Sequence, residues 1–356
     1  MNSPEATLTE LRERVLDAAG AGRTLRLRGA GSKDFLGESL EGEVLELRGH
    51  RGLVSYEPSE LVITARCGTP LSEIEAALAR EGQFLAFEPP AFGADPTIGG
   101  VIAAGLSGPR RVYAGAARDF VLGTRLLTAS GELLRFGGEV MKNVAGFDVS
   151  RLLCGSLGIL GVITEVSLKV LPLPRTEATV RLELPASDAL NTFNRLGALP
   201  LPLSGAAWTG GAAWLRLSGA APAVSAARLS IGGELVDEGP ARQFWQGLRD
   251  ATLPFFTNAP LWRLSMPSTA ALAPLERVPL IDWGGGLRWY GGVPASSDIR
   301  SAAVAGGGTA LCWRGPVTRG QRFHPLSGVS LELHRRLKAR FDPRGLFNPN
   351  RLVEGL

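Results

Sequence analysis

The residues that most constrain the chemistry of this chain are glycines gathered in two loops. One loop is RGAGSK at 28–33, directly after a predicted strand at 24–28, and the other is PTIGG at 96–100. Glycines let a backbone approach a ligand closely, and consecutive bared N–H groups can hold an anion. A short helix starting near Thr97 would add the positive end of its dipole. Two such loops could grip one pyrophosphate from opposite sides.

Two commoner phosphate motifs do not fit. In the dinucleotide fingerprint G-x-G-x-x-G, the third glycine after Gly29 and Gly31 is replaced by Asp34. The nucleoside-triphosphate loop G-x-x-x-x-G-K-[ST] does not occur. Either glycine loop alone is equally well explained as a tight turn in an Ala/Gly-rich protein. A third glycine-dense turn, GSLGILG at 155–161, precedes a predicted strand at 162–170, and the three together favour a phosphate ligand.

The composition indicates a soluble globular protein of two domains. The chain has 356 residues, 45% hydrophobic and 20% charged, with a net charge of +4. The arginines are scattered, which argues against nucleic-acid binding. Three distant cysteines match neither a disulfide framework nor a metal cluster and fit a reducing cytosol. We find no export signal and no apolar run long enough to span a membrane.

The pattern along the chain predicts a first lobe of strands and helices that ends at Pro172 and Pro174. Residues 120–129 and 133–136 indicate a hairpin. From 175 onward, short strands alternate with short helices, which is typical of an antiparallel sheet with helices on one face. An amphipathic helix is expected at 330–340. The expected domains are therefore residues 1–174, 175–329 and 330–356.

In this order the motifs resemble those of the FAD-binding oxidoreductases of the vanillyl-alcohol oxidase type, and within that group the FAD-binding subunits of bacterial glycolate oxidases. The resemblance covers most of the chain, and as a set its motifs are highly specific. They are RGAGSK (28–33), PTIGG (96–100), SGPRR (107–111), GAARDFVLG (115–123), KNVAGFD (142–148), GSLGILGVITEVSLKV (155–170), FHPL (323–326) and FDPRGLFNP (341–349).

The resemblance implies an α+β fold: a two-lobed FAD-binding domain of the PCMH type, completed by the returning C-terminal helix, and an α+β cap with an antiparallel sheet. The pyrophosphate would lie between the first two loops, the backbone near 162–163 would meet the adenine end, and the isoalloxazine would face the cap. The implied cofactor-binding residues are Arg28, Gly29, Ala30, Gly31, Ser32, Lys33, Pro96, Thr97, Ile98, Gly99, Gly100, Gly105, Ser107, Gly108, Arg118, Asp119, Gly158, Val162 and Ile163. Relatives with covalent flavin carry histidine in the first loop. This loop has none, so we expect non-covalent FAD.

Oxidation of a 2-hydroxy acid on flavin needs a cation for the carboxylate and a base for the hydroxyl proton. Of three histidines, His324 beside Arg322 is the best candidate base, although a histidine before proline is more often structural. Lys142 could stabilise negative charge on the reduced flavin, or could simply belong to a turn that enters a helix. No two histidines are separated by one residue, unlike in the catalytic flavin subunits of related dehydrogenases, so we expect no metal site.

Two hypotheses follow. In the first, the chain takes part directly in oxidising glycolate to glyoxylate within a complex and passes electrons through its flavin to an iron–sulfur partner subunit. In the second, it is a non-catalytic assembly or electron-relay subunit, and a larger FAD-linked sister subunit carries out catalysis. The scarcity of histidine favours the second. In either case the resemblance implies a cytoplasmic protein, held at the inner membrane only through its partners.

Overall fold

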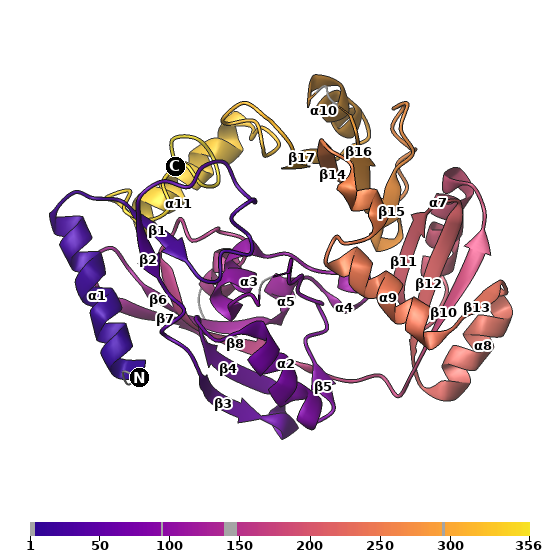
Figure 1. The fold of residues 1–356 in the computed structure, drawn as a ribbon, viewed down its shortest axis with the longest axis horizontal. Helices are drawn as coiled ribbons and strands as arrows, with labels where there is room; N and C mark the ends of the chain where they lie inside the picture. Colours follow the sequence, from indigo (N-terminus) through magenta and orange to yellow (C-terminus); the bar gives the residue numbers. More distant parts are fainter. Residues whose placement is uncertain (1–3, 94, 139–147, 294–295) are drawn as a thin grey trace. The chain divides into compact units, whose positions relative to one another are not determined.

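The chain forms two compact units, which we describe separately. The computed structural model describes residues 4–93, 95–138, 148–293 and 296–356 (Figure 1). Unit 1 contains Met1–Leu106, Ala116–Pro172 and Pro325–Leu356, and unit 2 contains Ser107–Gly115 and Leu173–His324. The division after Pro172 lies close to the boundary expected from the prolines. Residues 107–115, which we had assigned to the first domain by their place in the sequence, belong to unit 2 instead.

A five-stranded antiparallel sheet is the centre of unit 1. Its strand order is β3 (Leu53–Glu57), β4 (Val62–Arg66), β8 (Val162–Lys169), β6 (Val121–Leu127) and β7 (Leu133–Gly137). The predicted hairpin is confirmed as β6 and β7, and the predicted strand at 162–170 is confirmed as β8. The apolar residues of β8 are almost all buried, because this central strand pairs with β4 on one side and β6 on the other.

A second, smaller sheet of unit 1 joins the two ends of the chain. Strand β1 (Leu25–Arg28) pairs in parallel with β2 (Glu43–Glu46), and Leu25 also forms a parallel bridge with Phe347. Helix α1 (Pro4–Gly20) packs Leu11 and Val15 into the same core. The C-terminal segment, with helix α11 (Gly328–Phe341), thus completes the layer that begins at β1.

Short elements of unit 1 connect these two sheets. They are α2 (Leu71–Arg80), α3 (Ile98–Ala104), α5 (Ala117–Phe120), α6 (Val149–Leu153), β5 (Gln83–Phe84), β9 (Leu171–Pro172) and the 3-10 turn η1 (Pro58–Glu60). Helix α3 confirms the helix predicted to start near Thr97, whose hydroxyl accepts a hydrogen bond from the Gly100 N–H at 3.4 Å. Ile98, Val101 and Ile102 of this helix are fully buried, which anchors it beside the main sheet.

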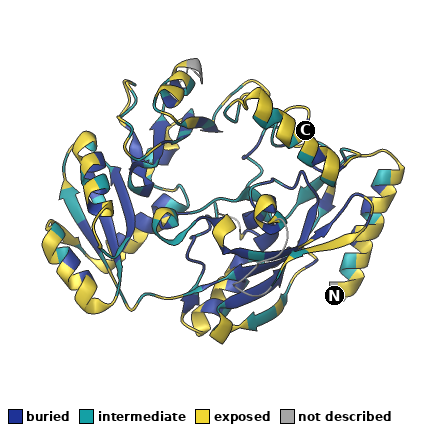
Figure 2. Cartoon of the chain, turned by 180° about the vertical axis from the view of Figure 1, so that it is seen from behind, coloured by how far each residue is buried: buried dark blue, intermediate teal, exposed yellow. Residues whose placement is uncertain are grey.

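Unit 2 is built on one eight-stranded antiparallel sheet with the order β13-β10-β12-β11-β15-β16-β14-β17. The strands are β10 (Thr176–Glu183), β11 (Leu203–Thr209), β12 (Ala212–Gly219), β13 (Glu234–Val236), β14 (Leu261–Ser265), β15 (Leu280–Asp282), β16 (Leu287–Gly291) and β17 (Thr309–Arg314). The predicted antiparallel sheet is therefore confirmed. Figure 2 shows its strands buried and the outer faces of the helices that cover it exposed.

The helices of unit 2 cover both faces of this sheet, and the expectation of one covered face was wrong. Helices α7 (Ala186–Gly197), α8 (Ala221–Ile231) and α10 (Ser296–Ala305) pack on one face. Helix α9 (Glu238–Arg249) packs on the other face. Its Phe244 stacks on Trp214 of β12 with ring centroids 4.0 Å apart, and its Trp245 donates a hydrogen bond to Thr179. Helix α9 therefore covers the aromatic ring of Trp214 on the second face and shields it from water.

Candidate cofactor site

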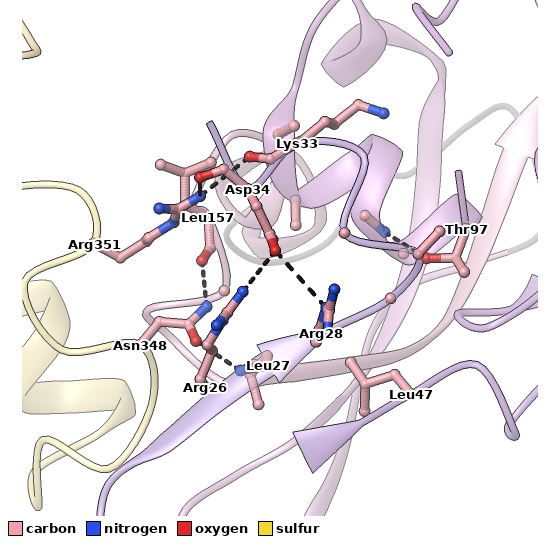
Figure 3. A pocket seen from close by; sticks show the side chains of 18 of the residues that line it. Arg26, Leu27, Arg28, Lys33, Asp34, Leu47, Thr97, Leu157, Asn348 and Arg351 are labelled. Carbon is pink, nitrogen blue, oxygen red and sulfur yellow. Dashed lines mark hydrogen bonds and ion pairs between the residues drawn. The ribbon is translucent and has the colours of Figure 1, made fainter. Parts of the chain in front are cut away.

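A pocket with about 890 Å³ of empty space lies within unit 1, where the three glycine turns converge (Figure 3). The first turn follows β1, the second leads into α3, and the third precedes β8. This volume includes the part of the pocket that is open to solvent. The residues that line it are Arg26–Asp34, Ser39–Glu41, Leu47, Cys67, Thr97, Gly99, Gly100, Ala103, Ala104, Leu157, Gly158, Gly161, Ile163, Asn348 and Arg351.

The first two turns approach each other so closely that only glycine fits at the contact. A Cβ atom added to Gly29 would lie 2.2 Å from the Thr97 hydroxyl oxygen. This is well below any van der Waals separation, so the absence of a side chain at position 29 is a packing requirement. The contact also brings both loops to the lining of the same pocket. In the second loop, the Ile98 and Gly99 N–H groups already donate to the carbonyls of Thr69 and Cys67, both at 2.9 Å, so this loop contributes close backbone approach rather than bared amides.

The third turn is tied to the first strand by a residue from the C-terminal segment. The Asn348 side chain accepts a hydrogen bond from the Leu27 N–H at 2.7 Å and donates one to the Leu157 carbonyl, also at 2.7 Å. Gly158 has φ +74°, and a Cβ there would lie 2.7 Å from the Asn348 amide nitrogen. Asn348 thus holds β1 and the third turn at a defined separation across the pocket (Figure 3).

Positive charge predominates around the pocket. Arg26, Arg28, Lys33 and Arg351 line it, against Asp34 and Glu41. Asp34 lies between two of these arginines, 2.6 Å from a terminal nitrogen of Arg26 and 3.7 Å from Nε of Arg28 (Figure 3). One acid therefore orients both guanidinium groups at the first turn. The remaining excess of positive charge suits a ligand with a diphosphate.

Arg351 fixes the backbone of the first loop rather than only adding charge. Its guanidinium donates hydrogen bonds to the carbonyl oxygens of Lys33 and Asp34, both at 3.1 Å, and to that of Ser39 at 3.2 Å. These three carbonyls belong to the segment that leads from the first glycine turn to β2. The C-terminal segment therefore holds this loop in place from outside the glycine motif.

Cys67 is one of the residues that line the pocket. A Cβ added to Gly99 would lie 2.7 Å from the Cβ of Cys67, so this residue forms part of the pocket floor. Burial raises the pKa of the Cys67 thiol to about 12. The thiol is consequently neutral at physiological pH and a poor nucleophile.

Many of the predicted cofactor residues line this pocket. They are Arg28, Gly29, Ala30, Gly31, Ser32, Lys33, Thr97, Gly99, Gly100, Gly158 and Ile163. Four predicted residues do not line the pocket but are adjacent in sequence to residues that do: Pro96, Ile98, Gly105 and Val162. Arg118 and Asp119 lie at α5, where the Asp119 carboxylate accepts a hydrogen bond from the Ala116 N–H at 2.8 Å. Ser107 and Gly108 belong to unit 2.

Sequence reasoning missed several lining residues, above all Arg26, Asp34, Asn348 and Arg351. Asp34 directly follows the first glycine motif and Arg26 lies two residues before it, so their charge and position were a usable signal. Asn348 lies in the FNP motif that contributed to the family resemblance, but nothing in that motif indicates which distant backbone groups it contacts.

Two of the three candidate catalytic residues lie in the described part of the chain, and both contact strand β17. Arg322 donates a hydrogen bond to the carbonyl of Cys312, a residue of strand β17, at 3.1 Å. His324 Nδ1 accepts a hydrogen bond from the Ala310 N–H at 3.3 Å. Lys142 lies outside the residues that the structure describes.

The His324 geometry argues against its service as a base. Burial and the nearby Arg300 lower the pKa of His324, so the ring is neutral at physiological pH. A neutral ring whose Nδ1 accepts a hydrogen bond carries its proton on Nε2. Nε2 then donates and cannot receive the hydroxyl proton of a substrate. His324 can act as a base only if the bond to Ala310 breaks.

The described residues contain neither a cluster of metal-ligating side chains nor a helix that could span a membrane. No group of three or more His, Cys, Asp or Glu side chains is placed to hold a metal ion among residues 4–93, 95–138, 148–293 and 296–356. Within the same ranges, every helix is too short or too polar to cross a lipid bilayer.

Comparison with known proteins extends what the geometry indicates. The family described as FAD binding domain matches residues 6–137. The chain is 48% identical to glycolate oxidase subunit GlcE of Escherichia coli, over 97% of each chain. It is 33% identical to glycolate oxidase subunit GlcD of Bacillus subtilis, over 39% of this chain and 29% of that one. The resemblance to FAD-binding oxidoreductases is therefore confirmed.

A solved structure with a similar fold supports the architecture. Alkyldihydroxyacetonephosphate synthase superposes with a TM-score of 0.67 at 15% identity, covering 96% of this chain and 74% of that protein. Such low identity shows the fold alone. The predicted α+β fold, with a PCMH-type FAD-binding domain and a second domain with an antiparallel sheet, is confirmed.

Proposed function

Because this chain belongs to the family of glycolate oxidase subunits typified by GlcE, within the FAD-dependent oxidoreductases, we propose that it is the FAD-binding subunit of a complex that oxidises glycolate or a similar short 2-hydroxy acid. The observation that carries this proposal is the pocket of unit 1, in which paired glycine turns and an excess of positive charge converge. These features fit the diphosphate of a dinucleotide cofactor.

The residues of the chain have distinct roles in this proposal. The pyrophosphate lies between the loops at 28–33 and 97–100, and Arg28 and Lys33 neutralise its charge. The backbone at Val162 and Ile163 meets the adenine end. Asn348 and Arg351 keep the walls of the pocket in place from behind. FAD, when bound, would accept the hydride of the alcohol carbon, which carries both electrons of the oxidation, while the hydroxyl proton leaves to a base.

The flavin is held without a covalent bond. None of the three histidines, His50, His324 and His334, lines the pocket. The Cys67 thiol does line it, but its raised pKa leaves it protonated. Precipitating the purified protein with acid tests this directly, since the yellow colour is expected in the supernatant. Colour that stays with the pellet contradicts non-covalent binding.

The partners we propose are a larger FAD-linked sister subunit and an iron–sulfur subunit that receives electrons from the flavin. The name of the Escherichia coli relative, a subunit of glycolate oxidase, supports such an assembly. We propose a location at the cytoplasmic side of the inner membrane, reached through these partners.

A second candidate function is that of a non-catalytic or electron-relaying flavin subunit, and the geometry of His324 favours it. Its Nδ1 accepts the Ala310 N–H, so no histidine base is ready in unit 2. Catalysis would then take place in the sister subunit.

Anaerobic addition of glycolate to the isolated FAD-loaded chain separates the two functions. Bleaching of the flavin absorbance within the turnover time of the complex supports direct oxidation by this chain. Bleaching only after the sister subunit is added supports the relay. If the flavin is not reduced even in the assembled complex, both versions of the proposal fail.

A further inference from the structure

A pair of arginines in unit 2 lies against one tryptophan ring. The Arg111 guanidinium carbon, on helix α4 (Arg111–Ala114), is 4.3 Å from the centre of the Trp283 ring. The corresponding carbon of Arg263, on β14, is 4.9 Å from the same centre and 5.8 Å from that of Trp289. Arg263 and Trp289 are register partners in adjacent strands. Two cations therefore share one aromatic surface although they repel each other.

The turn that carries Trp283 has an unusual backbone. Trp283 has φ +53°, and Gly284 and Gly285 follow with φ +61° and +104°. A bulky side chain in the left-handed region is strained and persists only where the surroundings require it. The indole is fixed by its N–H, which donates to the Gly108 carbonyl at 3.0 Å. This bond joins the turn to the segment that contains Arg111.

The Asp282 carboxylate lies at the same turn as Trp283. The Asp282 carboxylate accepts a hydrogen bond from the Trp283 N–H at 2.7 Å and is almost fully buried. Its attraction raises the pKa of Arg263, yet burial and the proximity of Arg111 outweigh it and lower that pKa to about 10. An additional negative charge here would thus be stabilised by both guanidinium groups.

We propose that Arg111 and Arg263, with Trp283 and Trp289 as walls, form a binding site for a small carboxylate. The inference rests on the proposed function, because it assigns the site to the carboxylate of the short 2-hydroxy acid. Guanidinium groups pair with carboxylates through two parallel hydrogen bonds. The rings exclude water, which strengthens that pairing.

The test uses the FAD-loaded full chain and isothermal titration calorimetry. Glycolate and acetate, which both carry a carboxylate, are expected to bind, and ethylene glycol, which lacks one, is not. Arg111→Gln and Arg263→Gln should each weaken glycolate binding at least tenfold, because a charge-assisted bond contributes on the order of tenfold or more. Arg242→Gln is the matched control, since Arg242 is exposed on α9 and pairs with Glu238. It should bind glycolate as the unchanged chain does.

Three further measurements distinguish a loss of glycolate binding from a loss of folding and from a failure of the proposed function. FAD content and thermal midpoint should stay unchanged in Arg111→Gln, whose side chain lies on a short helix rather than inside the sheet. Arg111→Lys should retain part of the affinity, because charge without the planar fork remains. In the assembled complex, Arg111→Gln should raise KM for glycolate more than it lowers kcat.

The inference is overturned if both glutamine variants bind glycolate like the unchanged chain, or if the FAD-loaded chain binds neither acid. In those cases the assembled complex can still oxidise glycolate with an unaltered KM, and the proposed function stands. The opposite result is also possible: both acids bind through Arg111 and Arg263, but the assembled complex does not oxidise glycolate. That result contradicts the proposed function and supports the carboxylate site.

Discussion

Gly29 and Thr97 meet at the wall of the cofactor pocket, and their contact leaves no room for a methyl group. A Cβ at position 29 would lie 2.2 Å from the Thr97 hydroxyl. Gly29→Ala must therefore separate the two loops, at a cost of about 1–3 kcal/mol, as is typical of overpacking. We expect the purified variant to contain much less FAD, measured by the ratio of flavin to protein absorbance. Gly20→Ala, at the open end of α1, is the control and should keep its FAD. Full flavin occupancy in Gly29→Ala would contradict the site.

Asn348 is the residue through which the C-terminal segment acts on the pocket. Asn348→Ala leaves the Leu27 N–H and the Leu157 carbonyl without this partner, and each unsatisfied group costs about 1–3 kcal/mol. We expect FAD affinity to fall on the order of tenfold, measured by fluorescence titration of the apoprotein. Asn191→Ala, exposed on α7, should bind FAD normally. Equal affinities of the two variants would mean that Asn348 does not shape the pocket.

The glycines of the pocket could be predicted from sequence, whereas its polar clamps could not. A glycine indicates that the backbone at its own position takes an unusual conformation or lies close to another group. The three glycine-dense turns were therefore enough to predict where the pocket lies. Asn348 and Arg351 contact groups more than 300 positions away in the chain. No local pattern encodes such contacts, because the partners are backbone atoms that every residue possesses. The candidate catalytic residues His324, Arg322 and Lys142 remain a prediction.

At the scale of elements, helix α11 is held to unit 1 by one buried charge pair. Lys338 donates to Asp342 at 2.7 Å and also to the carbonyls of Ile159 and Phe347. Asp342 in turn accepts hydrogen bonds from the N–H groups of Leu346 and Phe347. The Lys338 ammonium therefore makes three hydrogen bonds, one for each of its N–H groups. Burial lowers the pKa of Lys338, and the bond to Asp342 opposes that shift.

Removing that ammonium should destabilise the protein strongly. Lys338→Met leaves the Asp342 carboxylate buried without its cation, which typically costs about 3–5 kcal/mol. Arg336→Met is the matched control on the same helix, where an exposed pair with Glu332 contributes about 0–1 kcal/mol. Urea unfolding followed by circular dichroism measures both. Similar midpoints for the two variants would show that this pair does not anchor the helix.

The element pattern of unit 2 was predicted only in part. Alternating short strands and helices indicated an antiparallel sheet, which the structure has. The position of α9 on the second face depends on Trp214 and Phe244, which lie in different elements and meet only after folding. The assignment of residues 107–115 to unit 2 has a similar cause, because Arg110 pairs with Glu177 at 2.7 Å and donates a hydrogen bond to Ser218.

At the scale of the whole molecule, the two units have separate hydrophobic cores, and the cofactor pocket lies within one of them. FAD should therefore stabilise unit 1 selectively, by about 2.7 kcal/mol at a free concentration of one hundred times Kd. In differential scanning calorimetry we expect two transitions, of which one rises with FAD concentration and the other does not. A single transition that shifts as a whole would show that the units unfold together.

The pocket depends on residues from opposite ends of the chain, since Asn348 contacts Leu27 across 321 positions. During synthesis on the ribosome, the first glycine loop emerges long before the side chains that brace it. A nascent chain therefore has no finished place for the coenzyme until residue 351 has left the exit tunnel. Flavin loading should be a late, post-translational event, and prematurely terminated products should be colourless.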